Sequence, residues 1–102
     1  MIKISVLYTA APKDPEAFDK HYLGVHIPLC DKLPGIQRLE VTKYTGTLDG
    51  KAAPVYLQTD LVFESQDAAM AAFGSDVGKE LVADMANLQG TPTTTAVGPI
   101  LT

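Results

Sequence analysis

The spacing of the apolar residues changes in a fixed order along this chain, and that order restricts the folds open to it. The segment Ile2–Tyr8 alternates apolar and polar residues, which is the two-residue repeat of a β-strand. Five apolar residues then recur at helical spacing and form one stripe: Phe18, Tyr22, Val25, Leu29 and Leu33. The chain therefore begins with a strand followed by an amphipathic helix.

The ends of this helix carry recognisable signals. Asp14 can accept a hydrogen bond from the first turn, and Pro15 suits the first helical position because its missing N–H has no partner there in any case. Pro34-Gly35 is a sequence that stops a helix. We expect the helix to lie between these two signals.

The second half of the chain repeats the strand and helix patterns. Two β-like segments, 36–44 and 55–63, flank a turn that contains Asp49-Gly50, as in an antiparallel hairpin. Ser65 can cap a short helix to residue 73, and Ser75 or Asp76 can start another. The face of that last helix carries Val77, Leu81, Met85 and Leu88. The segment 93–101, rich in threonine and β-branched residues, predicts a final strand.

The resulting order, β-α-β-β-α-β, predicts an α+β protein with a ferredoxin-like fold, in which residues 1–102 form a single domain. Helices should cover one face of a four-stranded antiparallel sheet. Leu7, Leu39 and Val41 have parities opposite to those of their apolar neighbours, which predicts a half-apolar second face. We expect that face to pair with a second copy in a homodimeric α+β barrel.

Composition excludes several classes of partner. A formal net charge of −4, with the basic residues scattered, gives no footprint for nucleic acid. No segment approaches the roughly 20 apolar residues of a membrane span, so we expect no membrane partner. The sequence has no secretory signal pattern and a single cysteine, Cys30, which favours a cytoplasmic location.

The segment Tyr22–Leu29 holds the strongest chemical signal, a histidine within an apolar helix. Tyr22 precedes His26 by four residues and therefore shares its face. Pro28 cannot donate to the preceding turn, so the helix should kink or restart near His26. This arrangement predicts His26 as a general base and Tyr22 as a donor to a developing enolate oxygen.

Other interpretations of these residues stay open. His26 can be structural, donating to a carbonyl freed by the proline, and Tyr22 can be a core aromatic. Cys30 is an inert buried thiol, a nucleophile beside His26, or half of a metal site that no second cysteine completes. In an α-helix His21 lies about 140° from His26, which predicts a solvated surface residue.

A resemblance to a known family rests on one set of motifs. The strand IKISVLY is followed by Phe18, Tyr22 and His26 at intervals of four, by Pro28-Leu29, and by Leu33-Pro34-Gly35. This pattern resembles the EthD family, small dimeric α+β-barrel proteins first named for a role in ethyl tert-butyl ether degradation. Members are often catalogued as reductases, but the chain has no dinucleotide or phosphate-loop fingerprint, and we expect no cofactor and no metal.

The resemblance leaves three functional classes. The first is a cofactor-independent cyclase, decarboxylase or isomerase acting on a hydrophobic oxygenated compound, similar to barrel-type polyketide cyclases. The second is a non-catalytic ligand carrier or accessory factor of an oxygenase system, and the third a haem-dependent monooxygenase with His26 as axial ligand. The expected binding residues for the small molecule are Phe18, Leu29, Tyr44 and Phe63. Tyr44 and five further polar positions face either the cavity or the solvent and partner side: Arg38, Glu40, Thr42, Gln58 and Asp60.

Overall fold

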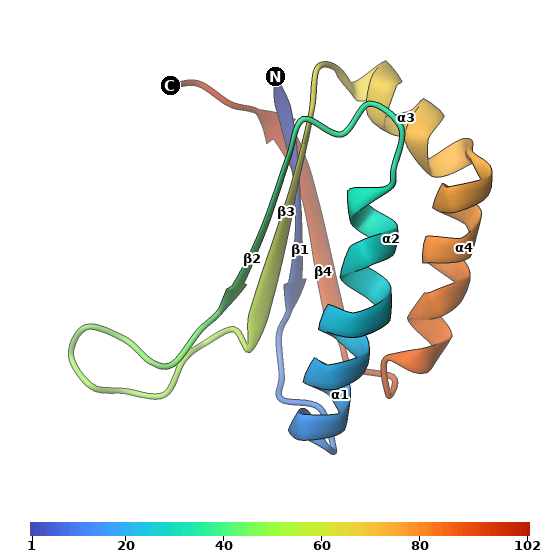
Figure 1. The fold of residues 1–102 in the computed structure, drawn as a ribbon. Helices are drawn as coiled ribbons and strands as arrows, with labels where there is room; N and C mark the ends of the chain where they lie inside the picture. The colour runs from blue at the N-terminus through green and yellow to red at the C-terminus, as the bar shows by residue number, and fades with distance from the viewer.

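The computed structural model describes all 102 residues and places the helices on one face of a four-stranded sheet (Figure 1). The elements in chain order are β1 (Ile2–Tyr8), α1 (Pro15–His21), the π-helix η1 (Tyr22–His26), α2 (Ile27–Asp31), β2 (Arg38–Lys43), β3 (Leu57–Phe63), α3 (Gln66–Gly74), α4 (Asp76–Asp84), the 3₁₀-helix η2 (Met85–Asn87) and β4 (Thr93–Pro99). The predicted β-α-β-β-α-β order is confirmed.

The sheet has the strand order β2-β3-β1-β4, and every neighbouring pair is antiparallel. Ile4 on β1 lies opposite Leu61 on β3 and opposite Val97 on β4, so the inner strands fix one another's register. This is the ferredoxin-like arrangement that the sequence predicts. No helix in the structure combines the length and the apolar character needed to cross a bilayer.

The predicted helix caps are present. The Asp14 carboxylate accepts from the backbone N–H of Ala17 at 3.1 Å, and Pro15 occupies the first helical position. Ser65 and Ser75 cap α3 and α4 in the same manner. These caps fix where three of the helices begin.

The first helical run changes its hydrogen bonding in the middle. From Tyr22 to His26 the backbone adopts a π-helical turn, in which the N–H of Ile27 donates to the carbonyl of Tyr22. The α-helix restarts at Ile27, next to Pro28, so the predicted interruption is confirmed. The wide turn also corrects the predicted stripe: Val25 is 44% exposed, and the buried positions are Phe18, Tyr22, His26, Cys30 and Leu33.

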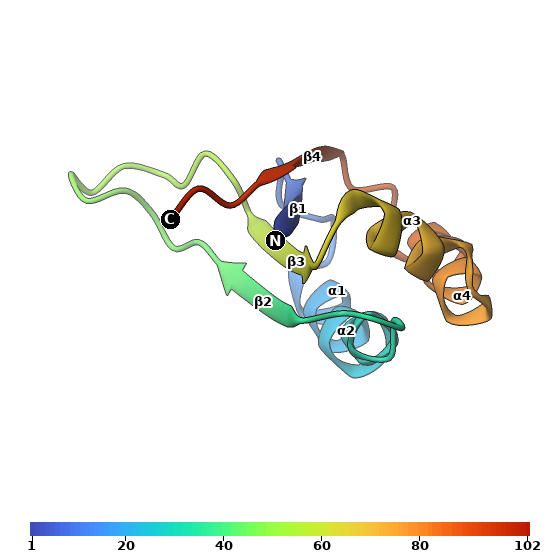
Figure 2. The same ribbon diagram turned by 90° about the horizontal axis from the view of Figure 1, so that it is seen from above.

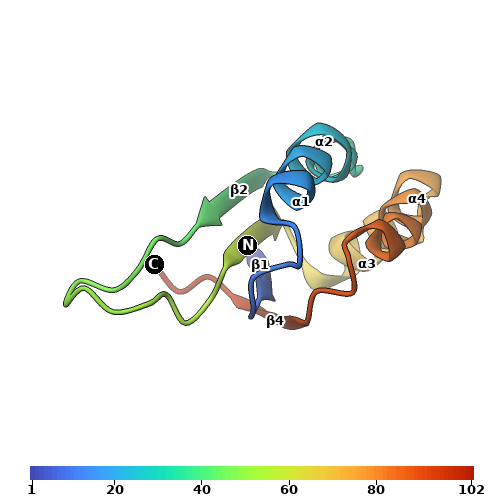
Figure 3. The same cartoon turned by 90° about the horizontal axis from the view of Figure 1, so that it is seen from below.

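The two helical layers sit differently on the sheet. Figures 2 and 3 show α1 and α2 over β2 and β3, whereas α3 and α4 stand further from the strands on the side of β1 and β4.

Gly78 lets α4 begin close against the end of α3, because a Cβ there would collide with the backbone carbonyls of Ala72 and Phe73. Ala69, Ala72 and Leu81 of these two helices still enter the buried core with Leu61 and Phe63.

The face opposite the helices is more polar than the sequence predicts. Leu39 and Val41 pack into the covered core, which corrects their expected place on the open face. Strand alternation instead leaves mainly polar side chains on the open face, with Leu7 and Val62 as the larger apolar members. There the Ser5 hydroxyl and the Gln58 amide both donate to the Asp60 carboxylate, at 2.6 and 2.9 Å.

Candidate functional site

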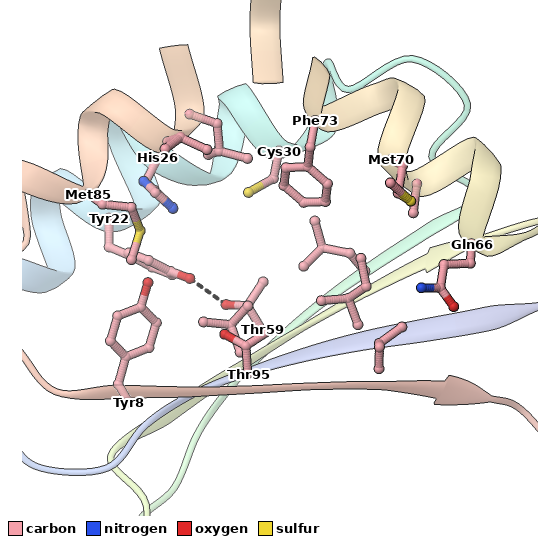
Figure 4. A pocket seen from close by; sticks show the side chains of 17 residues that line it. Tyr8, Tyr22, His26, Cys30, Thr59, Gln66, Met70, Phe73, Met85 and Thr95 are labelled. Atoms are coloured by element: carbon pink, nitrogen blue, oxygen red, sulfur yellow. Dashed lines mark hydrogen bonds between the residues drawn. The ribbon is translucent and has the colours of Figure 1, made fainter. Parts of the chain in front are cut away.

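A cavity of about 570 Å³ lies between the sheet and the second pair of helices (Figure 4). Its floor comes from β1, β3 and β4, and its other walls from η1, α2, α3, α4 and Met85. Hydrophobic residues make up 13 of the 17 that line it, and no Lys, Arg, Asp or Glu is among them. Such a cavity suits a mostly apolar small molecule.

His26 lines this cavity and is held from behind by a carboxylate. Its Nδ1 lies 2.8 Å from Oδ2 of Asp84, and both side chains are buried. Because an ionised carboxylate can only accept, Nδ1–H is the donor, and in the neutral ring Nε2 carries the lone pair. Nε2 forms no hydrogen bond within the protein and is the nitrogen left for a ligand.

Asp84 is fixed by three donors. Besides His26, Nε2 of His21 donates at 2.9 Å and the amide of Asn87 donates at 2.9 Å to the same carboxylate. Burial raises the pKa of Asp84, but the bonds from Asn87 and the two histidines outweigh it and hold the pKa below its ordinary value. Asp84 is therefore an anion at neutral pH.

Burial lowers the pKa of His26, and the hydrogen bond and charge of Asp84 offset only part of that effect. The imidazole is therefore neutral at pH 7. A neutral histidine with one nitrogen fixed and the other free is the arrangement that a general base requires. The site can accept a proton from a molecule held in the cavity.

The π-helical turn explains how two histidines five residues apart reach one carboxylate. In an α-helix His21 and His26 point in different directions, whereas the wider turn between them brings both to Asp84. The expectation that His21 is a solvated surface residue is therefore corrected, since its side chain is 31% exposed and bonded to Asp84. Turns of this kind occur frequently at functional sites.

Asp84 was not among the residues predicted from the sequence, although a signal for it exists. It lies three residues after Leu81 and four before Leu88, and both leucines are buried. Helical periodicity thus places a carboxylate on the buried face of α4. A charged residue at such a position is expected to be paired.

Tyr22 lies against His26 as predicted, and its hydroxyl is already engaged. The two rings stack with centroids 4.9 Å apart, and the Tyr22 hydroxyl lies 2.5 Å from that of Thr59. Figure 4 shows this bond at the same end of the cavity as His26. Burial raises the pKa of Tyr22, so its hydroxyl stays protonated.

Cys30 lies one turn beyond His26 and also lines the cavity. The side chain is buried, and burial raises the pKa of its thiol to about 12. Since the thiolate is the reactive form, the thiol is unreactive at neutral pH. Cys30 contributes shape to the cavity wall.

The four residues predicted to bind a ligand do not line this cavity. Phe18 stacks on the far side of Tyr22 with a centroid separation of 5.4 Å, and Phe63 is fully buried in the core. Leu29 packs against the core as a partly buried residue. Tyr44 follows β2, where its hydroxyl donates to Gln58. The other polar positions considered from the sequence likewise belong to the open face, away from the cavity: Arg38, Glu40, Thr42, Gln58 and Asp60.

Comparison with known proteins places the chain in a family. Residues 10–91 match the EthD domain. The chain belongs to the EthD family. An uncharacterised 11.0 kDa protein from the thcB–thcC intergenic region of Rhodococcus erythropolis is 38% identical over 87 residues, which cover 85% of this chain and 82% of that protein.

Solved structures agree with this assignment. An EthD-family protein from Bacillus halodurans superposes with a TM-score of 0.88 at 31% identity, over 99% of both chains. An EthD-like protein from Ralstonia eutropha superposes with a TM-score of 0.79 at 20% identity, over 99% of this chain and 92% of that one. The predicted family and fold are thus both confirmed.

Proposed function

We propose that this EthD-family protein catalyses proton transfer on a hydrophobic, oxygenated small molecule, with His26 as the general base. The observation that carries the proposal is the pairing of His26 with Asp84 at the wall of an apolar cavity. Asp84 fixes Nδ1 as the protonated nitrogen and leaves the Nε2 lone pair toward the ligand. Tyr22, stacked on the ring, restricts its rotation.

The proposed step moves one proton. Nε2 of His26 removes a proton from a carbon next to a carbonyl group, or from a phenol, and the imidazole becomes an imidazolium. The negative charge of Asp84 at Nδ1 stabilises that cation. The electron pair left on the substrate forms an enolate or phenolate, the intermediate through which cyclisation, isomerisation and some decarboxylations proceed. The proton returns to the product or to solvent.

A hydrogen-exchange assay tests this step without knowledge of the natural substrate. The probe is 2-tetralone, whose acidic α-protons exchange with deuterium from D₂O and whose loss of α-proton signal is followed by NMR. General base catalysis contributes typically about 10²- to 10⁴-fold. We expect His26→Gln to reduce the protein-catalysed exchange rate by a factor in that range while the variant stays folded and still binds 2-tetralone.

Equal exchange rates in the wild type and His26→Gln would show that His26 is not the base. Binding of 2-tetralone without exchange in the wild type would instead favour the ligand carrier. The two functional classes thus give different results in one assay.

Asp84→Asn separates a charge effect from a structural one. Because Asp84 raises the pKa of His26, removal of its charge lowers that pKa further. The exchange rate, which rises with pH as His26 loses its proton, should then begin to rise at a lower pH and reach a lower plateau. An unchanged pH profile would contradict the role of Asp84.

We also propose that the protein is a homodimer through the open sheet face. In one chain this face is left uncovered by the helices, and it carries the hydrogen-bonded network of Ser5, Gln58, Asp60 and Tyr44. Antiparallel sheets of this kind pair face to face. Light scattering coupled to gel filtration should give twice the mass of the chain, and a monomer mass would contradict the proposal.

A further inference from the structure

Tyr8 carries a polar atom that the protein leaves without a partner. The residue is 1% exposed, and its hydroxyl is the single fully buried side-chain N or O atom in the structure that forms no hydrogen bond. Buried hydroxyl groups are normally satisfied by protein or ordered water, so this one requires an explanation. Its position supplies one, because Tyr8 lines the cavity that contains His26.

The hydroxyl is aimed at the end of the cavity where His26 lies. Figure 4 shows the Tyr8 side chain rising from β1 with its oxygen near the Tyr22 ring and on the same side of the cavity as His26. The rings of Tyr8 and Tyr22 pack edge to face with centroids 5.3 Å apart, and Tyr8 packs on Phe18 at 5.5 Å. These contacts hold the ring in one orientation.

Tyr8 is therefore a better candidate than Tyr22 for binding an oxygen atom of the ligand. The hydroxyl of Tyr22 already shares a hydrogen bond with Thr59, whereas that of Tyr8, which has Tyr22 as a polar neighbour, makes no hydrogen bond of normal geometry. Burial raises the pKa of Tyr8, and the neighbouring Tyr22 hydroxyl offsets only part of that effect, so the group is a neutral donor at physiological pH. A donor of this kind is matched by a carbonyl or enolate oxygen.

The rest of the cavity limits the body of such a ligand. No charged side chain is among its lining residues, and desolvation of a carboxylate or phosphate there would have no compensating cation. Between Tyr8 and Gln66, which lies at the other end of the cavity, the wall is apolar, with Ile4, Leu61 and Phe73 along it. This composition favours an uncharged molecule with an oxygen at one end and a hydrocarbon body.

We propose that the hydroxyl of Tyr8 is the specificity-determining donor that binds the carbonyl oxygen of an uncharged, largely hydrocarbon ketone in this cavity. The inference rests on the proposed function, since it names the substrate class of the same site. It also assigns a second group to the proton transfer: when His26 removes the α-proton, the charge that develops on the oxygen lies at Tyr8.

Equilibrium binding to two matched probes tests this assignment. 2-Tetralone and tetralin share the same two-ring body and differ by the carbonyl group, so their dissociation constants isolate the contribution of the oxygen. One hydrogen bond of ordinary strength corresponds to about a tenfold change in affinity. We expect the wild type to bind 2-tetralone about tenfold more tightly than tetralin, and Tyr8→Phe to bind both with the affinity of tetralin.

Tyr56→Phe is the matched control. Its hydroxyl donates to Asp19 outside the cavity, so the affinity for both probes should stay at the wild-type value. Chemical-shift changes of the backbone amides on titration report both the dissociation constant and the location of the probe. They also show whether each variant is folded.

Four results would overturn the proposal. The first is that the wild type binds the two probes with equal affinity, and the second is that Tyr8→Phe keeps its full affinity for 2-tetralone. The third is that Tyr8→Phe loses affinity for both probes to the same extent. The fourth is that the wild type binds 1,2,3,4-tetrahydro-2-naphthoate more tightly than the ketone. None of these readouts requires turnover. A failure of the exchange assay with His26 therefore leaves the result for Tyr8 separate and interpretable.

Discussion

The two helical layers of this protein differ in how closely they pack on the sheet. In the first layer, α1 to α2, Phe18 and Tyr22 are each 1% exposed and stack on one another above β3. In the second layer, α3 to η2, Met70 is 66% exposed and Val82 60% exposed, although both also line the cavity. Both layers border the cavity, but the first does so with buried side chains and the second with several exposed ones.

This difference separates two tasks within one small fold. The groups with specific geometry, His26 and Tyr22, are placed by the tightly packed layer, where stacked rings restrict their movement. The loosely packed layer supplies flexible apolar side chains such as Met70 and Met85, which adapt to different ligand shapes. The side chain proposed to react thus comes from the first layer, and the adaptable side chains that shape the ligand space come from the second. The hydrogen bond between His26 and Asp84 joins the two layers.

The largest expected effect breaks the packed layer. Phe18→Ala removes a buried ring that contacts Tyr8, Tyr22 and Tyr56, and truncations of this kind cost about 3–5 kcal/mol. Met70→Ala, in the loose layer, is the matched control and should change stability by less than about 0.5 kcal/mol. Urea unfolding of both variants measures the difference, and similar losses would contradict the distinction between the layers.

The second prediction concerns acid pH, which protonates the hydrogen-bonded pair of His26 and Asp84 that joins the two layers. The folded-state pKa values of His26 and Asp84 both lie below their ordinary values, so the unfolded chain binds more protons than the folded one as the pH falls. Stability should be fully present above about pH 6.5 and should decrease as His26 begins to titrate in the unfolded chain, with a further loss below about pH 4 from Asp84.

Urea midpoints at pH 7, 6, 5 and 4 measure this dependence. His26→Gln removes the first decrease and leaves the second. If the midpoint is constant from pH 7 to pH 5 in the wild type, the histidine is not held neutral by the fold.

The smallest effect has an unusual sign. Tyr8→Phe deletes a hydroxyl that is buried without a hydrogen bond, and release of that unsatisfied group should stabilise the ligand-free protein by about 1 kcal/mol. The same change in Tyr56, whose hydroxyl donates to Asp19, should be destabilising or neutral. Thermal unfolding without ligand compares the two, and a clear loss of stability in Tyr8→Phe would indicate a partner for its hydroxyl.

Local rules were sufficient for most of the fold. Alternation predicts the strands, Asp14 and Ser65 are recognisable as helix caps, and Ser75 is one of two candidates for the third cap. The four-residue step from Tyr22 to His26 predicts their common face. These features depend on residues close together in the sequence, so the sequence pattern contains them.

The rest of the site depends on contacts between distant residues. His26 and Asp84 are 58 positions apart, and His21 joins them because the helix changes its hydrogen bonding at Tyr22. Nothing in the local pattern indicates that Tyr8, an ordinary strand residue in the sequence, ends with a free hydroxyl in a cavity. Phe18, a predicted binding residue, stacks against Tyr22, and it is Tyr22 that lines the cavity.

The wide turn at Tyr22–His26 changes how the spacing of residues along the helix sets the directions of their side chains. A π-helical turn contains one residue more than the α-helical turn it replaces. Gly24 lies exposed within it, and a Cβ added there would meet no other atom within 4 Å. Loss of that one residue would restore α-helical winding and leave the two histidines four positions apart, about 40° from each other, so that both would still face Asp84. What places two histidines on one carboxylate is therefore their relative phase around the helix, which five residues supply with the wide turn and four would supply without it.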